Sequence, residues 1–301
     1  MAYSASASAK TILFGEHAVV YNNPAIAIPL HNARTTVTFE PSGEEFRVFS
    51  DAIRLDSRFE ELDDASGLKS LLKLLRDELG IERFPAETLR IETDIPIASG
   101  LGSGAALSIA VIRLFSDRYG ANLTTERINE LAYEIEKIYH GKPSGIDNTT
   151  IAYEQPVLFS KLKGFKALEA DIARLPLLVI DSGIRSRTVD VVMDVYNNFA
   201  RNENAIRQIG DLVRKAESAL KTGTAAEIGA LMDENQSLLR QIDVSCPELD
   251  HWIDLAKKNG AVGAKLTGAG RGGNFLVMAR DHEHLSALRE LFKEQGLNVI
   301  T

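Results

Sequence analysis

The residues best suited to chemistry lie in a short segment rich in glycine and serine. Residues 99–104, Ser-Gly-Leu-Gly-Ser-Gly, contain three glycines and two serines. Glycine permits positive φ angles and close approach of the backbone to a ligand. The first turn of a following helix offers unpaired N–H groups and the positive end of its dipole, which together suit an anion. The segment therefore predicts a phosphate-binding loop, although a tight connection packed against a sheet uses the same residue types.

The elements around this segment support a strand, loop and helix in that order. Residues 88–93 alternate like a strand and end shortly before Pro96, whereas residues 105–115 are apolar on most faces, as in a buried helix. The loop lacks the Lys-Ser or Lys-Thr pair of P-loop NTPases, and its glycines do not follow the dinucleotide pattern G-x-G-x-x-G. It is therefore neither of the two commonest phosphate-binding patterns.

A second candidate group is the charged pair Glu16 and His17, which interrupts an otherwise apolar segment shortly after Lys10. Such a pair must be solvated in a cleft or hydrogen-bonded, because burial of a charge without partners is costly. Taken alone, a histidine in this setting is more often a satisfied structural residue than a site residue.

A third candidate group lies in residues 140–148, His-Gly-Lys-Pro-Ser-Gly-Ile-Asp-Asn. The glycines and the proline predict a rigid turn that presents Ser144, Asp147 and Asn148 at the start of a short helix. In isolation, Asp147 is best interpreted as a helix-capping residue. Glu136 lies on the preceding helix, which we expect over residues 124–140.

The second half of the chain offers two further polar groups. Residues 264–274 form another glycine-rich segment, which leads into an expected strand at 275–278. Arg185 and Arg187 follow an apolar strand expected at 175–181. Either arginine could pair with a substrate carboxylate or with a nearby aspartate, and the sequence favours neither.

The remaining pattern predicts a mixed α and β chain. Residues 35–39 and 45–49 alternate around a Pro-Ser-Gly turn and predict a hairpin. Two long helical patterns, up to residue 223 and from 225 to 242, suggest a helical layer in a second lobe. Other expected elements are strands at 25–30 and 156–159, helices at 68–79 and 282–294, an amphipathic segment at 249–257, and a terminal strand.

The composition limits the class of protein. The chain has 301 residues, 45% of them hydrophobic and 25% charged, and a formal net charge of -8. This balance is typical of a soluble globular protein and argues against nucleic-acid binding, which needs a basic face. Its single cysteine, Cys246, fits a reducing compartment. Without a long apolar run or signal-peptide pattern, the sequence predicts a cytoplasmic protein with no membrane segment.

Three of these segments together resemble the GHMP kinases, a family of small-molecule kinases. Lys10 with Gly15-Glu16-His17 is similar to the first family motif, although Ser8-Ala9 stands where the family usually has Pro-Gly. Pro96, residues 100–103 and Ala105-Ala106 resemble the second motif, and residues 264–274 resemble the third. The resemblance covers nearly the whole chain. It implies an α+β GHMP kinase fold with two lobes: an N-terminal lobe at 1–170, like domain 2 of ribosomal protein S5, and a ferredoxin-like C-terminal lobe at 171–301 with a helical layer.

The resemblance also implies roles for individual residues. It implies catalysis by Asp147 and Lys10, and Mg²⁺ binding by Glu136 and Ser103. It implies contacts to the acceptor from Glu16, His17, Ser144 and Thr188. It implies ATP binding by the residues of the second motif, Pro96, Gly100, Leu101, Gly102, Ser103, Gly104, Ala105 and Ala106. A homodimer is compatible with this reading.

Residues 140–148 narrow the implied reaction. They closely resemble the stretch that carries the catalytic aspartate in family members that phosphorylate the 5-hydroxyl of (R)-mevalonate, which implies mevalonate as the acceptor. A sister kinase acting on phosphomevalonate, another mevalonate hydroxyl or a different alcohol is the alternative. A non-catalytic nucleotide-binding homologue is a further alternative, which the presence of Lys10, Glu136 and Asp147 disfavours.

Gly104 departs from the family pattern, which usually has a serine at this position. Glycine removes a hydroxyl that helps to bind magnesium or phosphate in the family, but it keeps the backbone N–H. Either Ser103 or a water replaces the missing ligand, or activity is reduced. Because the other implied catalytic residues are intact, we expect the role to be filled already, so that a serine at position 104 would crowd the site.

Overall fold

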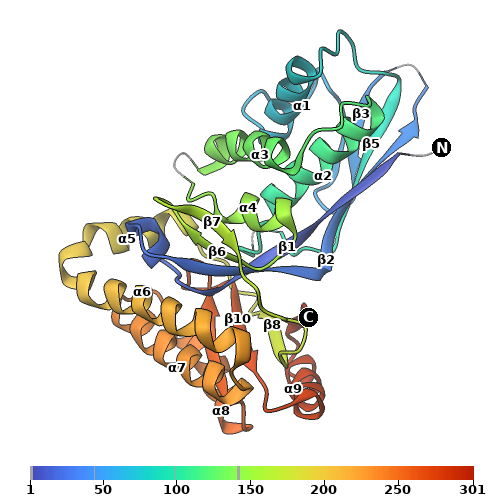
Figure 1. Ribbon diagram of the computed structural model, residues 1–301. Helices are drawn as coiled ribbons and strands as arrows, with labels where there is room; N and C mark the ends of the chain where they lie inside the picture. The colour runs from blue at the N-terminus through green and yellow to red at the C-terminus, as the bar shows by residue number, and fades with distance from the viewer. Residues whose placement is uncertain (1–2, 44, 98, 141–142) are drawn as a thin grey trace. The chain divides into compact units, whose positions relative to one another are not determined.

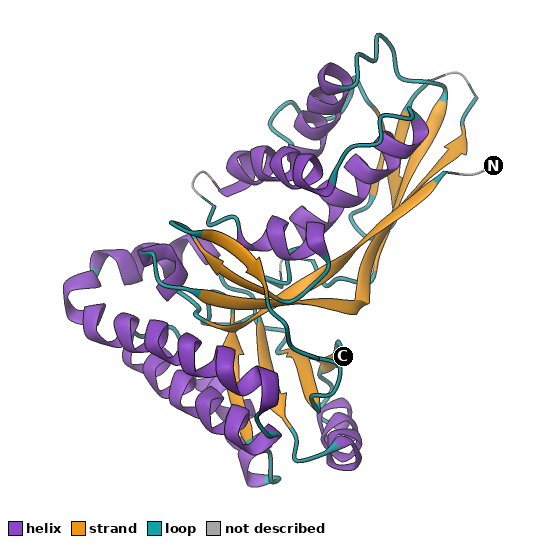
Figure 2. Cartoon of the chain, viewed as in Figure 1, coloured by secondary structure: helices purple, strands orange, loops and turns teal. Residues whose placement is uncertain are grey.

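The chain forms two compact units, each built from both helices and strands (Figures 1 and 2). The structure is a computed structural model that describes residues 3–43, 45–97, 99–140 and 143–301, with the side chains of residues 139 and 140 left out. Unit 1 comprises the described residues within 1–9, 33–96 and 102–154, and unit 2 those within 10–32, 97–101 and 155–301. The predicted α+β class is confirmed, and the predicted boundary between residues 170 and 171 stays a prediction.

Unit 1 combines part of a sheet with four helices. Its strands are β3 (Arg47–Ser50), β4 (Leu55–Arg58), β5 (Glu87–Thr93) and parts of the long strands β1 (Ser4–Phe14) and β2 (Ala25–Pro41). The helices are α1 (Gly67–Glu78), α2 (Ser103–Arg118), α3 (Thr125–His140) and α4 (Ile146–Tyr153). Helix α2 contacts the other three helices and is buried along most of its length, as its apolar sequence predicted.

The predicted hairpin between residues 35–39 and 45–49 is wrong. The first segment belongs to β2, whose residues Thr35–Pro41 pair antiparallel with β5. The second belongs to β3, which pairs parallel with β5 and antiparallel with β4. β5 therefore lies between the two segments that the local pattern had joined. Residues 25–30, expected as a separate strand, form the beginning of the same uninterrupted β2.

Unit 2 contains a second, four-stranded antiparallel sheet in the order β11 (Asn298–Val299), β8 (Leu177–Asp181), β10 (Asn274–Met278) and β9 (Gly263–Thr267). In the same unit, the first half of β2 pairs with β6 (Val157–Ser160), which pairs with β7 (Gly164–Ala167). A short 3₁₀ helix, η1 (Ala18–Tyr21), also belongs to this unit.

The predicted helical layer of the second half is confirmed. It comprises α5 (Thr188–Asn197), α6 (Phe199–Thr222), α7 (Ala225–Gln241) and α8 (Pro247–Lys258). Helices α7 and α8 contact β9, and Figure 1 shows α6 and α7 side by side. Thr224 and Glu227 form a capping box that begins α7. Helix α9 (His282–Glu294) contacts β8 and β11. Over the described residues, every helix is too short or too polar to cross a membrane.

Candidate active site

Three successive carbonyl groups of the predicted phosphate loop are bonded within unit 2. Asn274 Nδ2 donates to the carbonyl of Ser99 at 2.6 Å, and Lys10 Nζ donates to the carbonyl of Gly100 at 3.1 Å. The backbone N–H of Lys10 donates to the carbonyl of Leu101 at 3.0 Å. These partially negative oxygens are therefore held by donors of the protein, which reduces their repulsion of an anion at the loop.

The glycines of this loop allow backbone conformations with positive φ angles. Gly100 has φ 85° and Gly102 has φ 77°, in the left-handed region that favours glycine. A Cβ at Gly100 would meet nothing within 4 Å, so the conformation and the open surroundings, rather than close packing, explain this glycine. Gly102 is the N-cap of α2, which begins at Ser103. The first N–H groups of α2 have no partner inside the helix, as the predicted phosphate site requires.

Glu136 lies next to the first turn of α2. Its side chain is buried on α3, and a Cβ built at Gly104 would lie 3.6 Å from its Oε1. Mg²⁺ is commonly held by one or two carboxylates and completes its shell with phosphate and water oxygens. Among the residues that the structure describes, no group of three or more His, Cys, Asp and Glu forms a metal cluster. A carboxylate beside the predicted phosphate-binding end of α2 is the kind of ligand that Mg²⁺ bound together with a nucleotide would need.

Helix α4 presents Asp147 in its first turn. Gly145, with φ 90°, is the N-cap, and the hydroxyl of Ser144 accepts a hydrogen bond from the N–H of Ile146 at 3.3 Å. Asn148 is buried and donates to Asn129 Oδ1 on α3 at 2.7 Å. The predicted short helix is thus confirmed, and Asp147 is half-buried at its start. Residues 141 and 142 of the predicted stretch, and the side chain of His140, lie outside the described residues.

Glu16 is buried and fully engaged in unit 2. Its Oε1 forms an ion pair with Lys265 on β9, and Asn235 on α7 donates to its Oε2 at 3.0 Å. Lys265 is also fully buried, and this burial lowers its pKa while the neighbouring Glu16 carboxylate raises it. A buried charge requires such partners. The pair explains why a lysine stands in the otherwise apolar strand β9.

His17 is buried, neutral and held by the third glycine-rich segment. Its Nε2 lies 2.8 Å from the carbonyl of Ala269, so Nε2 carries the proton because a carbonyl oxygen only accepts. Burial lowers the pKa of His17 to about 4, against the opposing effect of the bond to Ala269. The backbone of His17 has φ 59°, which is unusual outside glycine. Its Nδ1 is therefore an acceptor near neutral pH.

The third glycine-rich segment lines a small pocket of about 20 Å³ in unit 2, together with Ser99, Gly100, Ser186 and Thr188. The pocket brings Thr188, expected to contact the acceptor, together with Gly100 of the phosphate loop. Ser186 anchors the segment by donating to the carbonyl of Gly270 at 2.7 Å. The volume is about that of one water molecule.

The two arginines that sequence reasoning left open both pair with aspartates. Arg185 makes a bidentate ion pair with the buried Asp181, at 2.7 and 2.8 Å. Arg187 is exposed and lies 3.5 Å from Asp190.

Sequence reasoning missed the partners of the site residues, namely Asn235, Lys265 and Asn274. Only Lys265 carried a local signal, because a lysine inside a buried strand needs a counter-charge.

Comparisons with known proteins agree with this geometry. Residues 66–155 match the family model described as the GHMP kinases N terminal domain, and residues 216–297 match that described as GHMP kinases C terminal. A mevalonate kinase of Thermococcus sibiricus is 33% identical over 93% of this chain and 90% of the relative. The crystal structure of the Methanococcus jannaschii mevalonate kinase superposes with a TM-score of 0.86, at 26% identity over 99% of this chain and 96% of that one.

A second solved structure is that of the L. major mevalonate kinase in complex with R-mevalonate. It superposes with a TM-score of 0.82 at 31% identity, and the match covers 97% of this chain and 91% of that chain. These likenesses confirm the fold that the sequence motifs implied. The roles of the individual site residues stay predictions.

Proposed function

This chain belongs to the GHMP kinase family, and from this premise we propose that it transfers the γ-phosphoryl group of ATP to the 5-hydroxyl of (R)-mevalonate, giving ADP and 5-phosphomevalonate. The observation that carries the proposal is the similarity, over nearly the whole chain, to a mevalonate kinase whose structure contains R-mevalonate. Lys10, Glu136 and Asp147 are all present, which favours an active enzyme over a non-catalytic homologue.

Phosphoryl transfer asks a protein mainly for positioning and charge stabilisation. We propose that the N–H groups around Gly102–Ala106 hold the phosphates of ATP at the N-terminus of α2. The bonded carbonyls of Ser99, Gly100 and Leu101 support this role, because they point at donors of the protein. Pro96 would fix the entry of the chain into this loop.

Two residues would act on the reacting groups. Asp147 would orient the acceptor hydroxyl and take its proton, a task for a carboxylate in the first turn of a rigid short helix. Lys10 would stabilise the charge that develops on the transferring phosphoryl group or on the attacking oxygen. The bond from Lys10 Nζ to the carbonyl of Gly100 supports this, because it fixes the ammonium group beside the loop.

Glu136 and Ser103 would hold Mg²⁺. When bound, the ion neutralises charge on the β- and γ-phosphates of the nucleotide. The buried Glu136 carboxylate beside the first turn of α2 supports this assignment. Magnesium itself, a cytoplasmic location and a homodimer remain parts of the proposal that rest on the sequence.

The acceptor would be contacted by His17, Thr188 and Ser144. The neutral His17 imidazole offers Nδ1 as an acceptor, and Thr188 lines the pocket of unit 2. Glu16 was predicted to contact the acceptor as well. Because both of its oxygens are bonded to Lys265 and Asn235, its contacts support a role in holding the backbone before His17.

The choice of acceptor is tested by initial rates of ADP release with ATP, Mg²⁺ and one of several alcohols. We expect turnover with mevalonate and little with 5-phosphomevalonate or unrelated alcohols. Turnover of phosphomevalonate alone would assign the chain to the sister kinases. ATP binding without turnover of any acceptor would assign it to the non-catalytic homologues.

The role of Asp147 is tested by Asp147→Asn. The variant should keep its fold and ATP affinity while kcat falls by roughly two to four orders of magnitude, as for loss of an acid or base group. Kinetics and nucleotide titration on the same preparation measure both quantities. A near-normal kcat would leave Asp147 only a structural role in α4.

A further inference from the structure

Glu154 adopts a backbone conformation that glutamate normally avoids. It is the C-cap of α4 with φ 46° and ψ 38°, in the left-handed region where helices usually place glycine or asparagine. Glutamate gains nothing there from its own backbone. A glutamate at this position therefore needs strong side-chain contacts to offset the cost of its backbone conformation.

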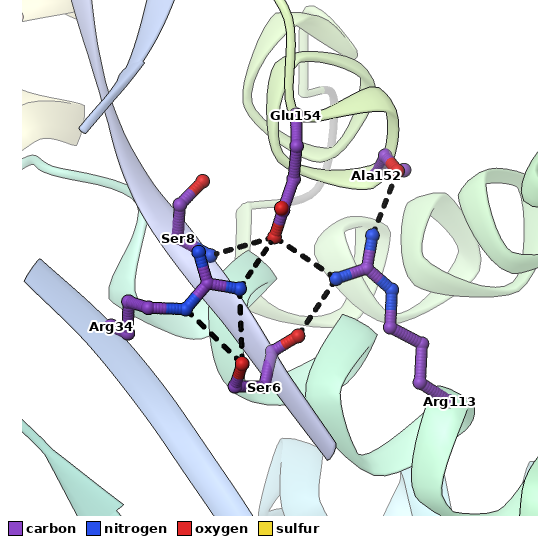
Figure 3. Close-up of polar contacts among 6 residues, drawn as sticks. All are labelled: Ser6, Ser8, Arg34, Arg113, Ala152 and Glu154. Carbon is purple, nitrogen blue, oxygen red and sulfur yellow. Dashed lines mark hydrogen bonds and ion pairs between the residues drawn. The ribbon is translucent and has the colours of Figure 1, made fainter. Parts of the chain in front are cut away.

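Those contacts converge on one carboxylate oxygen (Figure 3). Oε1 of Glu154 accepts hydrogen bonds from the N–H of Ser8 at 3.3 Å, from Arg34 Nη2 at 2.9 Å and from Arg113 Nη1 at 3.1 Å. Arg113 Nη2 also donates to the carbonyl of Ala152, in the last turn of α4, at 2.9 Å.

Both arginines also bind β1. Arg113 Nη1 donates to the carbonyl of Ser6 at 2.7 Å, and Arg34 donates twice to the Ser6 hydroxyl, at 3.1 and 3.0 Å. We call these residues the Glu154 cluster: Ser6, Ser8, Arg34, Arg113, Ala152 and Glu154. The cluster joins the end of α4 to β1, to β2 through Arg34 and to α2 through Arg113.

The charges of the cluster are partly shielded from water. The side chains of Arg34, Arg113 and Glu154 are 29%, 24% and 27% exposed. Burial alone would raise the pKa of the Glu154 carboxyl, but Arg113 and Arg34 together hold this pKa below its usual range. Glu154 is therefore an anion at neutral pH, and one carboxylate serves two cations. Removing it leaves both arginines without their shared counter-charge.

We propose that the Glu154 cluster is a positioning site for phosphoryl transfer, which fixes α4 so that Asp147 lies where the reaction needs it. The inference rests on the proposed function of Asp147. Helix α4 has eight residues, about two turns, with Asp147 in its first turn and Glu154 directly after its last. So short a helix moves as one body, and a shift at its end displaces the carboxylate at its start.

The chain contains a matched control for the electrostatic part of this cluster. Arg118 on α2 forms an ion pair with Glu87 on β5 at 3.3 Å, with side chains 31% and 22% exposed. It joins the same helix α2 to strand β5 of unit 1, whereas the Glu154 cluster joins α2 to the end of α4. Glu87→Gln therefore removes a comparable charge without releasing the helix that bears Asp147.

The test compares Glu154→Gln with Glu87→Gln by steady-state kinetics and thermal unfolding. We expect both variants to unfold at a lower temperature than the wild type. Only Glu154→Gln should lose kcat, by about tenfold to a hundredfold, since small misplacements of a reacting group cost this much. The KM for ATP should change less than about twofold, which is under 0.5 kcal/mol of binding.

A double-mutant cycle separates positioning from general damage. In an Asp147→Asn background, Glu154→Gln should cause almost no further loss of kcat, because residues that act as one unit are not additive. Glu154→Gly is the second variant, since glycine suits the left-handed backbone and protects folding. It should also lose kcat. Full kcat in Glu154→Gly, or an additive loss in the double variant, would overturn the inference.

Amide hydrogen exchange tests whether the Glu154 cluster holds α4 independently of whether the protein phosphorylates mevalonate. Exchange at residues 149–153 should be faster in Glu154→Gln than in Glu87→Gln, because the end of α4 has lost its anchor. If the wild type does not phosphorylate mevalonate, the proposed function fails, while faster exchange would still support α4 as the element that the cluster holds. Unchanged exchange together with unchanged kcat would reject the cluster as a positioning site.

Discussion

The chain carries two glycine-rich segments, residues 99–104 and 268–273, that look alike in sequence but meet different surroundings. In the first, a Cβ at Gly100 would meet nothing within 4 Å, and one at Gly104 would make ordinary contact with Glu136. In the second, a Cβ at Gly270 would overlap the carbonyl of Val244, and one at Gly272 would lie 2.8 Å from the carbonyl of Ile184. The first segment needs glycine for its shape and leaves space beside it, as a ligand loop must. The second needs glycine at positions 270 and 272 for close packing against neighbouring backbone, whereas a Cβ at Gly268 would meet nothing within 4 Å.

The largest effect should come from exchanging a glycine in the packed segment. Gly270→Ala combines the overlap at Val244 with φ 85°, so we expect it to lower the free energy of unfolding by about 3 kcal/mol. Gly100→Ala, also at φ 85°, should cost only about 1–2 kcal/mol, because its surroundings are open. Urea denaturation of both variants measures the difference.

Steady-state kinetics of Gly100→Ala extend the comparison of the two glycine-rich segments from stability to ligand binding. Gly100→Ala should raise the KM for ATP more than the KM for mevalonate, because its methyl group lies at the loop surface. Equal losses of stability in the two variants would show that the segments do not differ in the way their surroundings indicate.

The free energy of unfolding should depend on pH through His17, which anchors the packed segment. The folded-state pKa of His17 is about 4, against an ordinary value of 6.5. Between these values the unfolded chain binds a proton that folded His17 does not, so stability falls as the pH is lowered through this window. The full penalty is about 3 kcal/mol. His17→Asn should remove this part of the slope, since asparagine tolerates positive φ and stays neutral.

The measurement for His17 is the difference between wild type and variant in free energy of unfolding, taken at several pH values from 7 to 4. The contributions of other titrating groups to the free energy of unfolding cancel in this difference. A difference that does not change with pH would contradict the neutral, buried state of His17.

The smallest effect should come from Gly104→Ser in the open segment. The sequence led us to expect that a serine would crowd the site, but a Cβ there makes only ordinary contact, 3.6 Å from Glu136 Oε1. We now expect a gain of up to about 1 kcal/mol in unfolding free energy, because serine replaces glycine in a helix. The KM for ATP should stay within about twofold. Magnesium titration of initial rates checks the site, and markedly weaker ATP binding would restore the crowding explanation.

Local sequence patterns predicted the helices well, because helix periodicity and capping are local. Thr124 accepts from the N–H of Arg127 at the start of α3, and Ser66 caps α1, as such residues commonly do. The strand pairing was not local, and there the hairpin prediction failed. β3 pairs in parallel with β5, about 40 residues further along the chain, and nothing within residues 35–49 encodes that partner.

In the candidate site too, local features were predictable from the sequence and distant partners were not. The glycine and serine spacing of residues 99–104 indicated a loop with positive φ angles followed by a helix, and the structure has both. The partners of Glu16 and Glu154 were beyond prediction from spacing. Lys265 is 249 residues from Glu16, and Arg34 is 120 residues from Glu154, so only the folded chain brings these charges together.

The bond between Asn274 and the carbonyl of Ser99 has a consequence for the order in which parts of the protein fold during synthesis. The donor is encoded 175 residues after the acceptor, close to the end of the chain. Contacts of such long sequence separation form late and slow folding, because a large loop must close first. While the ribosome is still translating β10, the carbonyl of Ser99 lacks the donor that holds it in the folded protein. A truncated chain ending before residue 274 would therefore carry the predicted phosphate loop without the Asn274 bond that holds its Ser99 carbonyl.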